Sequence, residues 1–470
     1  MQQGTEPNPQ APRPARFGQS MLCFGGIIAI ISSGLFAFSI DLHSLLFLCL
    51  IWAGAHAGLL GYPALEIRHL MSKAISRALP AIYIFMLIGL VIASFIQSGT
   101  IATLMYFGLD WLSPALFLPV GLILCALMSL ATGTSWGTAG TLGVVFIGIG
   151  SALSVPLPLV AGMVVCGATF GDKMSPVSDT TNLAAMSSGT DLYRHIYAML
   201  FTTAPTFVLT LIIFSVLGWQ AGAGILPATQ LGDIRIALAA DYHLQPILTL
   251  LPIAVLFVLS IRRVPAEITM TASVLTAVAI ACVYQGQGLA PVLNSLWQNT
   301  PGNTGIVELD ALLGRGGLAS MSWTLLLAIQ ALALGGILHG AGFLASLLNG
   351  LIAKLQHTAA LIAATIASGF IGNMAMGEAY ISIILNCQLF AEKFSAQGLD
   401  KAVLSRSVEE GATMTTALIP WTTAGAFYAA TLGVPVLDYL PFAFFNYLNG
   451  PIAVIMAGLG IGLLRSKQKA

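Results

Sequence analysis

The sequence predicts an all-α polytopic membrane protein with about ten spanning helices, two re-entrant hairpins and two broken helices. Hydrophobic residues make up 57% of the 470-residue chain and charged residues only 8%, whereas soluble domains carry about 25% charged residues. Apolar runs of roughly 20 residues, the length that crosses a bilayer, recur from end to end. Polar, glycine-rich segments interrupt several runs, which indicates helices that break within the membrane.

The expected spans follow a polar, proline-rich tail, residues 1–20. The first apolar run is longer than the apolar part of a signal peptide and many similar runs follow it, so we expect it to be retained as the first helix. The predicted spans are 21–39, 43–62, 81–97, 156–171 continued by 176–188, 195–219, 246–262, 267–284, 318–338, 411–433 and 441–464.

Two apolar stretches, 114–152 and 357–396, are each about two short helices long. Each has a polar centre, ATGTSWGTAG in the first and GNMAMGEAY in the second. Backbone that leaves the helix at membrane depth must be buried in protein or face water, because lipid cannot satisfy free N–H and C=O groups. The sequence therefore predicts two re-entrant hairpins with these polar centres at their tips.

Basic residues give an independent prediction of the orientation. The external loops, 220–245 and 285–317, contain only Arg235 and Arg315. Since basic residues accumulate on the cytoplasmic side of a membrane, the N-terminus and the tail 465–470 are expected in the cytoplasm. The segments expected there carry Arg13, Arg16, Arg68, Lys73, Arg77, Arg194, Arg262, Arg263, Lys393, Lys401, Arg406, Arg465, Lys467 and Lys469.

The chain also shows a faint internal repeat at an offset near 240 residues, which pairs Gly137 with Gly377. The first half, 21–219, would begin inside and the second, 246–464, outside, so the repeats would be inverted. Inverted repeats with interrupted helices are the architecture of secondary transporters, whose site lies at the repeat interface. Each half would hold one hairpin and one broken helix, the broken helices being 156–188 and 411–433.

The stretch GDKMSPVSDTTN, residues 171–182, concentrates polar residues within an apolar segment. Pro176 has no N–H and its ring disfavours a helical residue before it, so the incoming helix is expected to stop near Asp172 and restart after the proline. Ser178 or Asp179 would cap the second half-helix. The break frees backbone carbonyls beside these oxygen-bearing side chains.

Such oxygen donors suit a small alkali cation, which takes them in place of its water shell. Two nearby carboxylates in a low dielectric cannot both ionise cheaply, so Asp172 or Asp179 is expected to hold a proton until a cation replaces it. This competition is proton/cation exchange, and Asp179 is favoured as the indispensable acid. The expected sodium ligands are Asp172, Asp179, Ser178 and Thr180.

Structural roles remain open for the same residues. Asp172 could form an ion pair with Lys173, and Asp179 could serve only as a helix cap. Glu378, in the second tip, could be a hydrogen-bonded acid that holds its hairpin together. Hydroxyls of the first tip could bond back to their own helix.

A second acidic pair, Glu409 and Glu410, stands where a helix is expected to re-enter from the cytoplasm. Both side chains are expected to face water at the cytoplasmic entrance of the transport pathway. Glu410 is the better candidate for facing the pathway itself.

Four stretches of the chain carry a family resemblance: ATGTSWGTAGTLG, GATFGDKMSPVSDTTNLAA, MGEAYISIIL and EEGATMTTALIPWTTAG. In this order, between about residues 80 and 435, they resemble successive signature stretches of the NhaC-type sodium/proton antiporter family. The resemblance implies secondary active exchange driven by an ion gradient. It also implies a fold of inverted repeats with two hairpins.

The resemblance further implies which side chains line the site. The chain departs from the family pattern at Ala379, where proline often follows the glutamate, and at Thr422, where asparagine often follows the tryptophan. These changes bear on the substrate more than on the mechanism. The implied site residues are Thr134, Ser135, Asp172, Ser178, Asp179, Thr180, Asn182, Asn373, Glu378, Thr415 and Thr416.

The expected function is sodium/proton antiport by an elevator-like or rocking motion in the bacterial inner membrane, with no cofactor besides the transported ions. The alternative is sodium-coupled exchange of a small carboxylate, as in the malate/lactate exchanger of the same family. Helices at the outer side of one repeat are free to form a homodimer scaffold.

Other function classes are disfavoured. The chain has no HExxH or GxSxG motif and no pair of aspartates on separate spans, so an intramembrane protease is not expected. Buried carboxylates and broken inverted helices disfavour a channel. A formal net charge of zero without a basic block removes the electrostatic case for nucleic acid.

Overall fold

The computed structural model describes residues 12–111, 114–222, 228–262, 264–352 and 357–465. Most of the predicted tails, together with Arg263, Lys467 and Lys469, lie outside these residues. The described residues form helices and no named strand, with one isolated bridge between Leu399 and Arg465.

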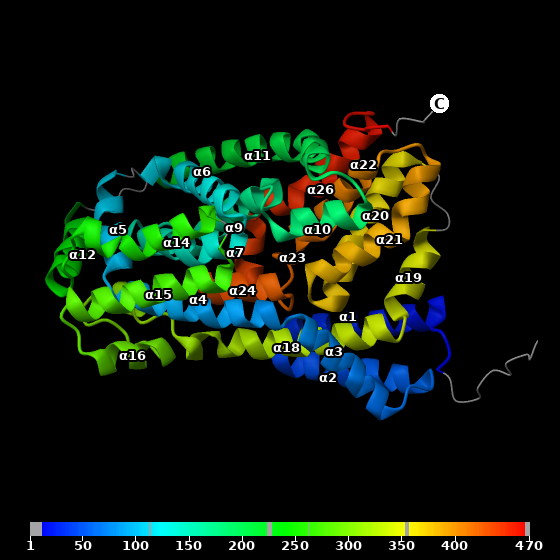
Figure 1. Cartoon of the computed structure of the whole chain (residues 1–470), viewed down its shortest axis with the longest axis horizontal. Coiled ribbons are helices and arrows are strands. Elements are labelled where there is room, and N and C mark those ends of the chain that lie inside the picture. The colour runs from blue at the N-terminus through cyan, green and yellow to red at the C-terminus, as the bar shows by residue number, and fades with distance from the viewer. Residues whose placement is uncertain (1–11, 112–113, 223–227, 263, 353–356, 466–470) are drawn as a thin grey trace, which may run out of the picture.

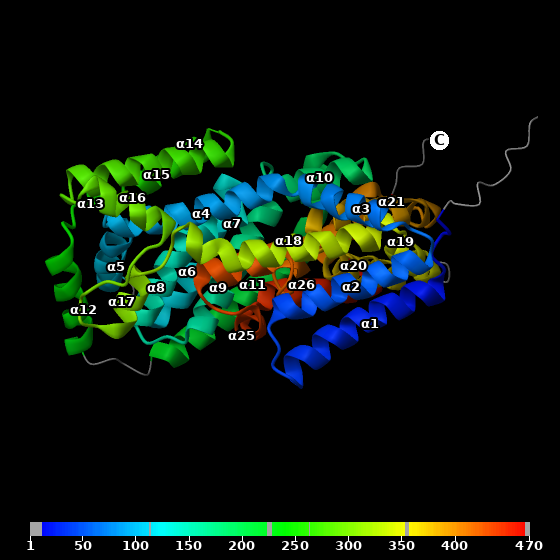
Figure 2. The same ribbon diagram turned by 90° about the horizontal axis from the view of Figure 1, so that it is seen from below.

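The first helices form a layer along one side of the molecule. Helices α1 (Phe17–Phe36) and α2 (Leu42–Leu59) pair with each other, and they lie beside α18 and α19 of the second half (Figures 1 and 2). Next, α3 (Ala64–Arg77) and α4 (Leu79–Gln97) follow one another with a bend of 46°. The segment ends in α5 (Thr100–Trp111).

The first predicted hairpin is present as two helical arms. Its first arm is α6 (Pro114–Thr132), and the rings of Phe117 and Phe146 on the two arms lie 5.8 Å apart. The chain reverses at Gly133, whose φ of +72° is readily available only to glycine. The second arm consists of α7 (Ser135–Thr138), the π-helical turn η1 (Ala139–Gly143) and α8 (Val144–Ala152).

The first predicted break is also present. Helix α9 (Leu157–Met174) ends just before Pro176, and α10 (Asp179–Ser188) begins after it. Helix α11 (Leu192–Gly222) is the next long helix. The loop predicted outside the membrane contains a further helix, α12 (Ala228–Asp241).

The span predicted at 246–262 is interrupted at Leu250. It consists of a single turn, α13 (Pro246–Thr249), and the short α14 (Leu251–Ile261). In both ribbon views the turn between α14 and α15 (Ala266–Val283) stops near the middle of the long axis (Figures 1 and 2). Arg262, the C-cap of α14, therefore does not join the end where the chain termini lie, because an 11-residue helix is too short to reach it.

The rest of the second half parallels the first. The segment predicted as an external loop contains two short helices, and a hairpin and a broken helix follow the long α18. The elements are α16 (Leu289–Trp297), α17 (Val307–Leu313), α18 (Leu318–Gly340), α19 (Phe343–Ile352), α20 (Thr358–Met376), α21 (Ala379–Ala396), α22 (Lys401–Gly411), α23 (Thr413–Thr416), α24 (Thr423–Leu432), α25 (Val436–Tyr439), η2 (Leu440–Phe442) and α26 (Phe444–Gly458).

Backbone features recur between the halves at one offset, 244 residues, close to the value near 240 expected from the sequence. The glycine at the first hairpin turn is Gly133 and not Gly137, which lies within α7, so the predicted pairing of Gly137 with Gly377 was shifted by one helical turn. The matching pairs are the turn glycines Gly133 and Gly377, the caps Thr134 and Glu378, the prolines Pro176 and Pro420, the caps Ser178 and Thr422, and the left-handed glycines Gly189 and Gly433.

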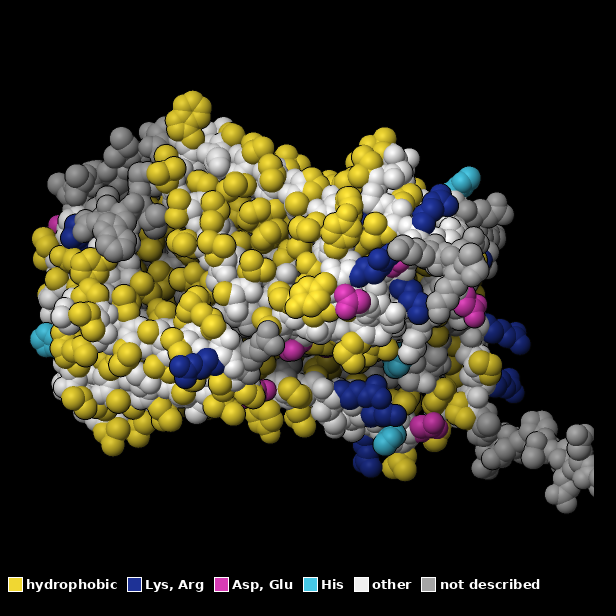
Figure 3. All heavy atoms as spheres, turned by 45° about the horizontal axis from the view of Figure 1, so that its top comes forward, with side chains coloured by type: hydrophobic (Ala, Val, Ile, Leu, Met, Phe, Trp, Pro, Cys, Tyr) yellow, Lys and Arg dark blue, Asp and Glu magenta, His cyan; other side chains and the backbone are white. Residues whose placement is uncertain are grey.

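The outer surface is apolar, as a membrane protein requires. Val208, Ile212 and Leu275 are more than half exposed, and hydrophobic side chains cover much of the surface in Figure 3. Within the described residues, eight helices are long and apolar enough to span a bilayer, or up to ten if each bent pair counts as one span. These findings confirm the prediction of an all-α polytopic membrane protein with broken helices.

Helix α9 lies at the centre of the molecule and packs most closely on α6. Two glycines, Gly167 and Gly171, allow this approach: a Cβ at Gly171 would lie 2.3 Å from the carbonyl oxygen of Ala126. Small residues four apart are a common means of close packing between membrane helices. Because α9 ends at the first break, this contact fixes the position of the break against the first hairpin.

We expect Gly171→Ala to lower the thermal stability of the detergent-solubilised protein, by about 1–3 kcal/mol if helices must separate to admit the methyl group. Gly54→Ala in α2 is the matched control, since a Cβ there meets nothing within 4 Å. Equal melting temperatures for the two variants would contradict the close packing of α9 on α6.

Candidate functional site

The carboxylate of Asp172, in the last turn of α9, joins the first hairpin tip to the first break. Its Oδ2 accepts hydrogen bonds from the Ser135 hydroxyl at 2.6 Å and the Ser135 backbone N–H at 3.2 Å. Its Oδ1 accepts a hydrogen bond from the Ser178 hydroxyl at 2.6 Å. Asp172 is half-buried, so these bonds replace much of its water. Three of the predicted site residues are therefore in direct contact.

Local sequence explains this junction. Thr134 caps α7 by accepting from the Gly137 N–H, and the Ser135 N–H at the start of the same helix donates to Asp172, as the N-terminus of a helix favours for an anion. Thr134 also lines a narrow crevice beside α14 and α15. Ser178 caps α10. A Cβ at Gly133 would lie 2.6 Å from Val177, so the tip and the break touch directly.

Two further predicted residues of the first break take different roles. The Thr180 hydroxyl lies 3.1 Å from that of Ser178, which extends the group of hydroxyls around Asp172. The Asn182 amide instead donates to the carbonyls of Pro176 and Ser178, at 2.9 and 2.8 Å. Asn182 therefore holds the break in shape by binding the carbonyls that the missing helical bonds leave free.

Asp179 does not bond to Asp172. It is the first residue of α10 and is exposed, and it makes no side-chain hydrogen bond to any residue that the structure describes. Tyr380, at the start of α21, interacts electrostatically with Asp172, Asp179 and Glu378. The three predicted acids are therefore close enough to one tyrosine to interact with it, and among them Asp172 accepts hydrogen bonds from two hydroxyls.

The second tip and the second break meet in the same manner. Gly377 accepts from the Thr423 N–H at 2.8 Å, and Glu378 caps α21 by accepting from the Ile381 N–H at 3.2 Å. Glu378 is thus a helix cap, a role that was considered for Asp179 and not for Glu378. Asn373 donates to the Ala412 carbonyl at 2.6 Å and to the Thr415 hydroxyl at 3.0 Å.

Some oxygen atoms of the second hairpin tip and the second break lack hydrogen-bond partners. Among the described residues, Asn373 Oδ1 and Thr416 Oγ1 are buried without one. A buried oxygen without a partner is costly, and both are of the neutral type that an alkali cation accepts. The same residues show no cluster of three or more His, Cys, Asp or Glu side chains that could hold a metal ion.

The largest difference from the sequence expectation concerns Glu409 and Glu410. Both were expected at a solvated mouth, but they are 0% and 1% exposed. The Glu409 carboxylate pairs with His195 Nε2 at 2.7 Å. Glu410 accepts a hydrogen bond from Thr202, and its carboxylate lies 3.8 Å from Arg406 Nε. His195 and Thr202 lie on α11, more than 200 residues away in sequence, and their contacts with the two carboxylates offset the cost of burying them.

Lys173 belongs to the same buried group. It is fully buried and donates to Asn449 Oδ1 at 3.0 Å, so the ion pair considered between Lys173 and Asp172 is not formed. Arg406, also fully buried, donates to the carbonyls of Ala198 and Gly462. The sequence signal that could have revealed this network is the charged run RSVEE, residues 406–410, within an otherwise apolar region.

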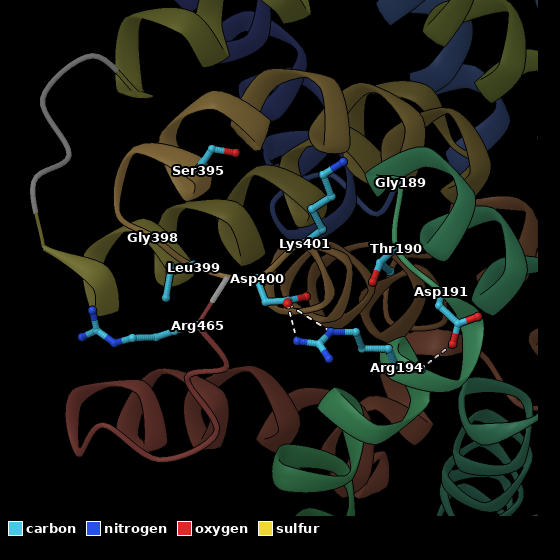
Figure 4. Close-up of a pocket in the computed structure, with 10 residues that line it drawn as sticks. All are labelled: Gly189, Thr190, Asp191, Arg194, Ser395, Gly398, Leu399, Asp400, Lys401 and Arg465. Atoms are coloured by element: carbon cyan, nitrogen blue, oxygen red, sulfur yellow. Dashed lines mark hydrogen bonds and ion pairs between the residues drawn. The ribbon is translucent and has the colours of Figure 1, made fainter. Parts of the chain in front are cut away.

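A surface hollow of about 650 Å³ lies at the end of the molecule that carries the chain termini (Figures 1 and 4). Arg194 and Asp400 form an ion pair across it, and Asp191, Lys401 and Arg465 also line it. None of the residues predicted to bind ions lines this hollow. It is therefore separate from the junction around Asp172.

Two hairpins and two interrupted helices that meet at buried oxygen atoms define a secondary transporter. The model of the Na+/H+ antiporter family matches residues 167–461 of this chain. The chain belongs to this family, which confirms the resemblance found in its sequence.

Relatives extend over nearly the whole chain. The Na+/H+ antiporter NhaC of Alkalihalophilus pseudofirmus is 37% identical, over 97% of this chain and 99% of its own length. The arginine/ornithine antiporter ArcD of Halobacterium salinarum is 35% identical, over 95% and 93%. The malate-2H+/Na+-lactate antiporter of Bacillus subtilis is 34% identical, over 85% and 86%.

We expect Arg406→Leu to destabilise the protein by about 3–5 kcal/mol, because it leaves Glu410 buried without its cation. The double variant Arg406→Leu, Glu410→Gln should recover part of this loss, since the unpaired charge is gone. Thermal unfolding of the purified variants measures both effects. A double variant that is no more stable than Arg406→Leu alone would show that the pair is not coupled.

Proposed function

We propose that this protein is a sodium/proton antiporter that works by alternating access, through an elevator-like or rocking motion. The observation that carries the proposal is the carboxylate of Asp172, surrounded by the hydroxyls of Ser135 and Ser178 where a hairpin tip meets a helix break. Membership of the Na+/H+ antiporter family supports it. The transported ions are the substrates, and we propose neither a cofactor nor an enzymatic reaction.

The geometry suggests how the site binds sodium. A hydroxyl donates one hydrogen bond and can accept others. Ser178 can therefore donate to Asp172 while its lone pair faces a cation, and the neighbouring Thr180 hydroxyl can supply a second lone pair. Sodium would bind to these hydroxyls, to Asp172 and to Asp179. In its absence a proton would cancel the negative charge that sodium leaves behind. Either ion lowers the cost of moving the site past lipid, whereas an empty, charged site is too costly to move.

In our proposal Asp172 contributes more to sodium binding than Asp179 does. Asp172 lies at the junction of two elements and accepts three hydrogen bonds, whereas Asp179 is exposed at the start of α10. The exposed acid suits a place where cations first arrive. From the second half, Asn373, Glu378, Thr415 and Thr416 would contribute oxygen atoms.

We also propose a location in the bacterial inner membrane with both termini in the cytoplasm. The described parts of α1 and the C-terminal segment begin and end at one end of the molecule (Figure 1), where lysine and arginine side chains gather (Figure 3). Basic residues prefer the cytoplasmic side. Inverted repeats, 21–219 and 246–464, and a homodimer belong to the same proposal.

Everted membrane vesicles test the antiport. Adding sodium to acidified vesicles should raise the internal pH, reported by a pH-sensitive dye. Asp172→Asn should fall below about a tenth of the wild-type rate, because a neutral amide gives sodium no negative charge to bind. Asp438→Asn, the same change at an exposed position in α25, serves as the control.

A carboxylate-coupled exchanger is the second candidate, supported by the similarity to the Bacillus subtilis malate/lactate antiporter. The N-terminus of α7 would suit a carboxylate, but Asp172 already occupies its first N–H. The same vesicles, loaded with labelled malate or lactate, separate the candidates. Sodium-dependent movement of either acid, with no pH change from sodium alone, would overturn the proposed sodium/proton exchange.

A further inference from the structure

A buried group of charges lies between the Asp172 junction and the hollow near the chain termini. Glu409 and Glu410 are on α22 together with Arg406, Lys173 is on α9 and His195 is on α11. Each side chain is at most 1% exposed. Charged residues at such depth are expensive and usually functional, and none of these five belongs to the ion site proposed above.

Glu409 is in direct contact with His195 and with the first break. Its Oε2 lies 2.7 Å from His195 Nε2, so a proton lies between these two atoms in one of the charge states of the pair. Its Oε1 accepts from the Thr181 hydroxyl at 3.3 Å. That hydroxyl also lies 3.3 and 3.0 Å from the carbonyls of Asp172 and Lys173. Glu409 is thus linked through one hydroxyl to the last turn of α9.

The charges around Glu409 do not balance unless a proton or a cation is added. Charged or titratable groups that interact with Glu409 are Asp172 and Lys173 from α9, His195 from α11 and Cys387 from α21. On the same helix as Glu409, Arg406 and Glu410 pair with each other at 3.8 Å, and Glu410 also interacts with Lys173. In the described structure, α20 and α26 pack on α22 without contributing a charged side chain. Three carboxylates therefore face two fixed cations, which leaves one negative charge when His195 is neutral.

We propose that the Glu409–His195 pair is the proton-binding centre of the exchanger, coupled by charge to the sodium site at Asp172. The inference rests on the proposed sodium/proton exchange and names where its proton is held. A proton from water bonds to the pair as sodium leaves Asp172, and it returns to water as sodium binds. Each exchange keeps the buried group neutral, so proton and sodium compete without sharing the same ligands.

The second ring nitrogen of His195 suggests where the proton enters. Its Nδ1 is buried and lacks a hydrogen-bond partner among the described residues. His195 follows Arg194 in the first turn of α11, and its backbone N–H donates to the carbonyl of Asp191; both neighbours line the hollow of Figure 4. A water entering from that hollow is the natural donor to Nδ1. The pair would thus exchange protons with the cytoplasmic side in the proposed orientation.

The test measures the KM for sodium of full-length protein in proteoliposomes across a series of pH values. For the wild type, competition between one proton and one cation should raise the KM up to about tenfold for each unit that the pH falls. Glu409→Gln should raise the KM by about tenfold, because an attractive charge is lost, and should remove most of its pH dependence. His195→Gln should flatten the same pH profile.

Two controls separate this role from a structural one. Glu409→Asp keeps the charge and should keep the wild-type pH profile, and so should Glu392→Gln, the same chemical change at an exposed position in α21. If Glu409→Gln does not fold, the pH dependence of the KM in His195→Gln alone tests the inference. Wild-type pH dependence in both His195→Gln and any folded Glu409→Gln would overturn the inference. A wild type without sodium/proton exchange would instead overturn the proposed function.

Discussion

The structure depends on one constraint: a carboxylate placed among apolar helices must be bonded by the protein, because lipid gives it nothing. Asp172 meets this constraint with two serine hydroxyls and one backbone N–H. Supplying these donors requires the helix break at Pro176, which places Ser178 beside the acid, and the hairpin turn at Gly133, which brings Ser135 to it. The breaks that look like defects in the span are the means by which the charge is bonded.

The second half uses the same construction with different chemistry. Its hairpin turn at Gly377 and its break at Pro420 recur 244 residues after those of the first half. Thr416 stands where the first half has Asp172, so the second break has neutral oxygens and no acid. The two halves therefore share one backbone plan, but only the first break contains an acid. That asymmetry suits a site whose total charge one cation or proton can cancel.

Much of this was predictable because it is local. Proline, glycine and capping residues act on their own helix turns, so both breaks, both hairpins and the Ser178 cap follow from the sequence. The burial of Glu409 and Glu410 does not, since it depends on His195, Thr202 and Lys173, which are distant in sequence. The interruption at Leu250, between α13 and α14, was also not predicted, because hydrophobicity alone does not show it.

The most direct measurement is proton release when sodium binds to the purified protein in a weakly buffered solution with a pH dye. Competition between the two ions predicts a saturable acidification on adding sodium chloride, none on adding choline chloride, and none for Asp172→Asn with either salt. Sodium binding that releases no protons from the wild type, or the same release from Asp172→Asn, would contradict the account.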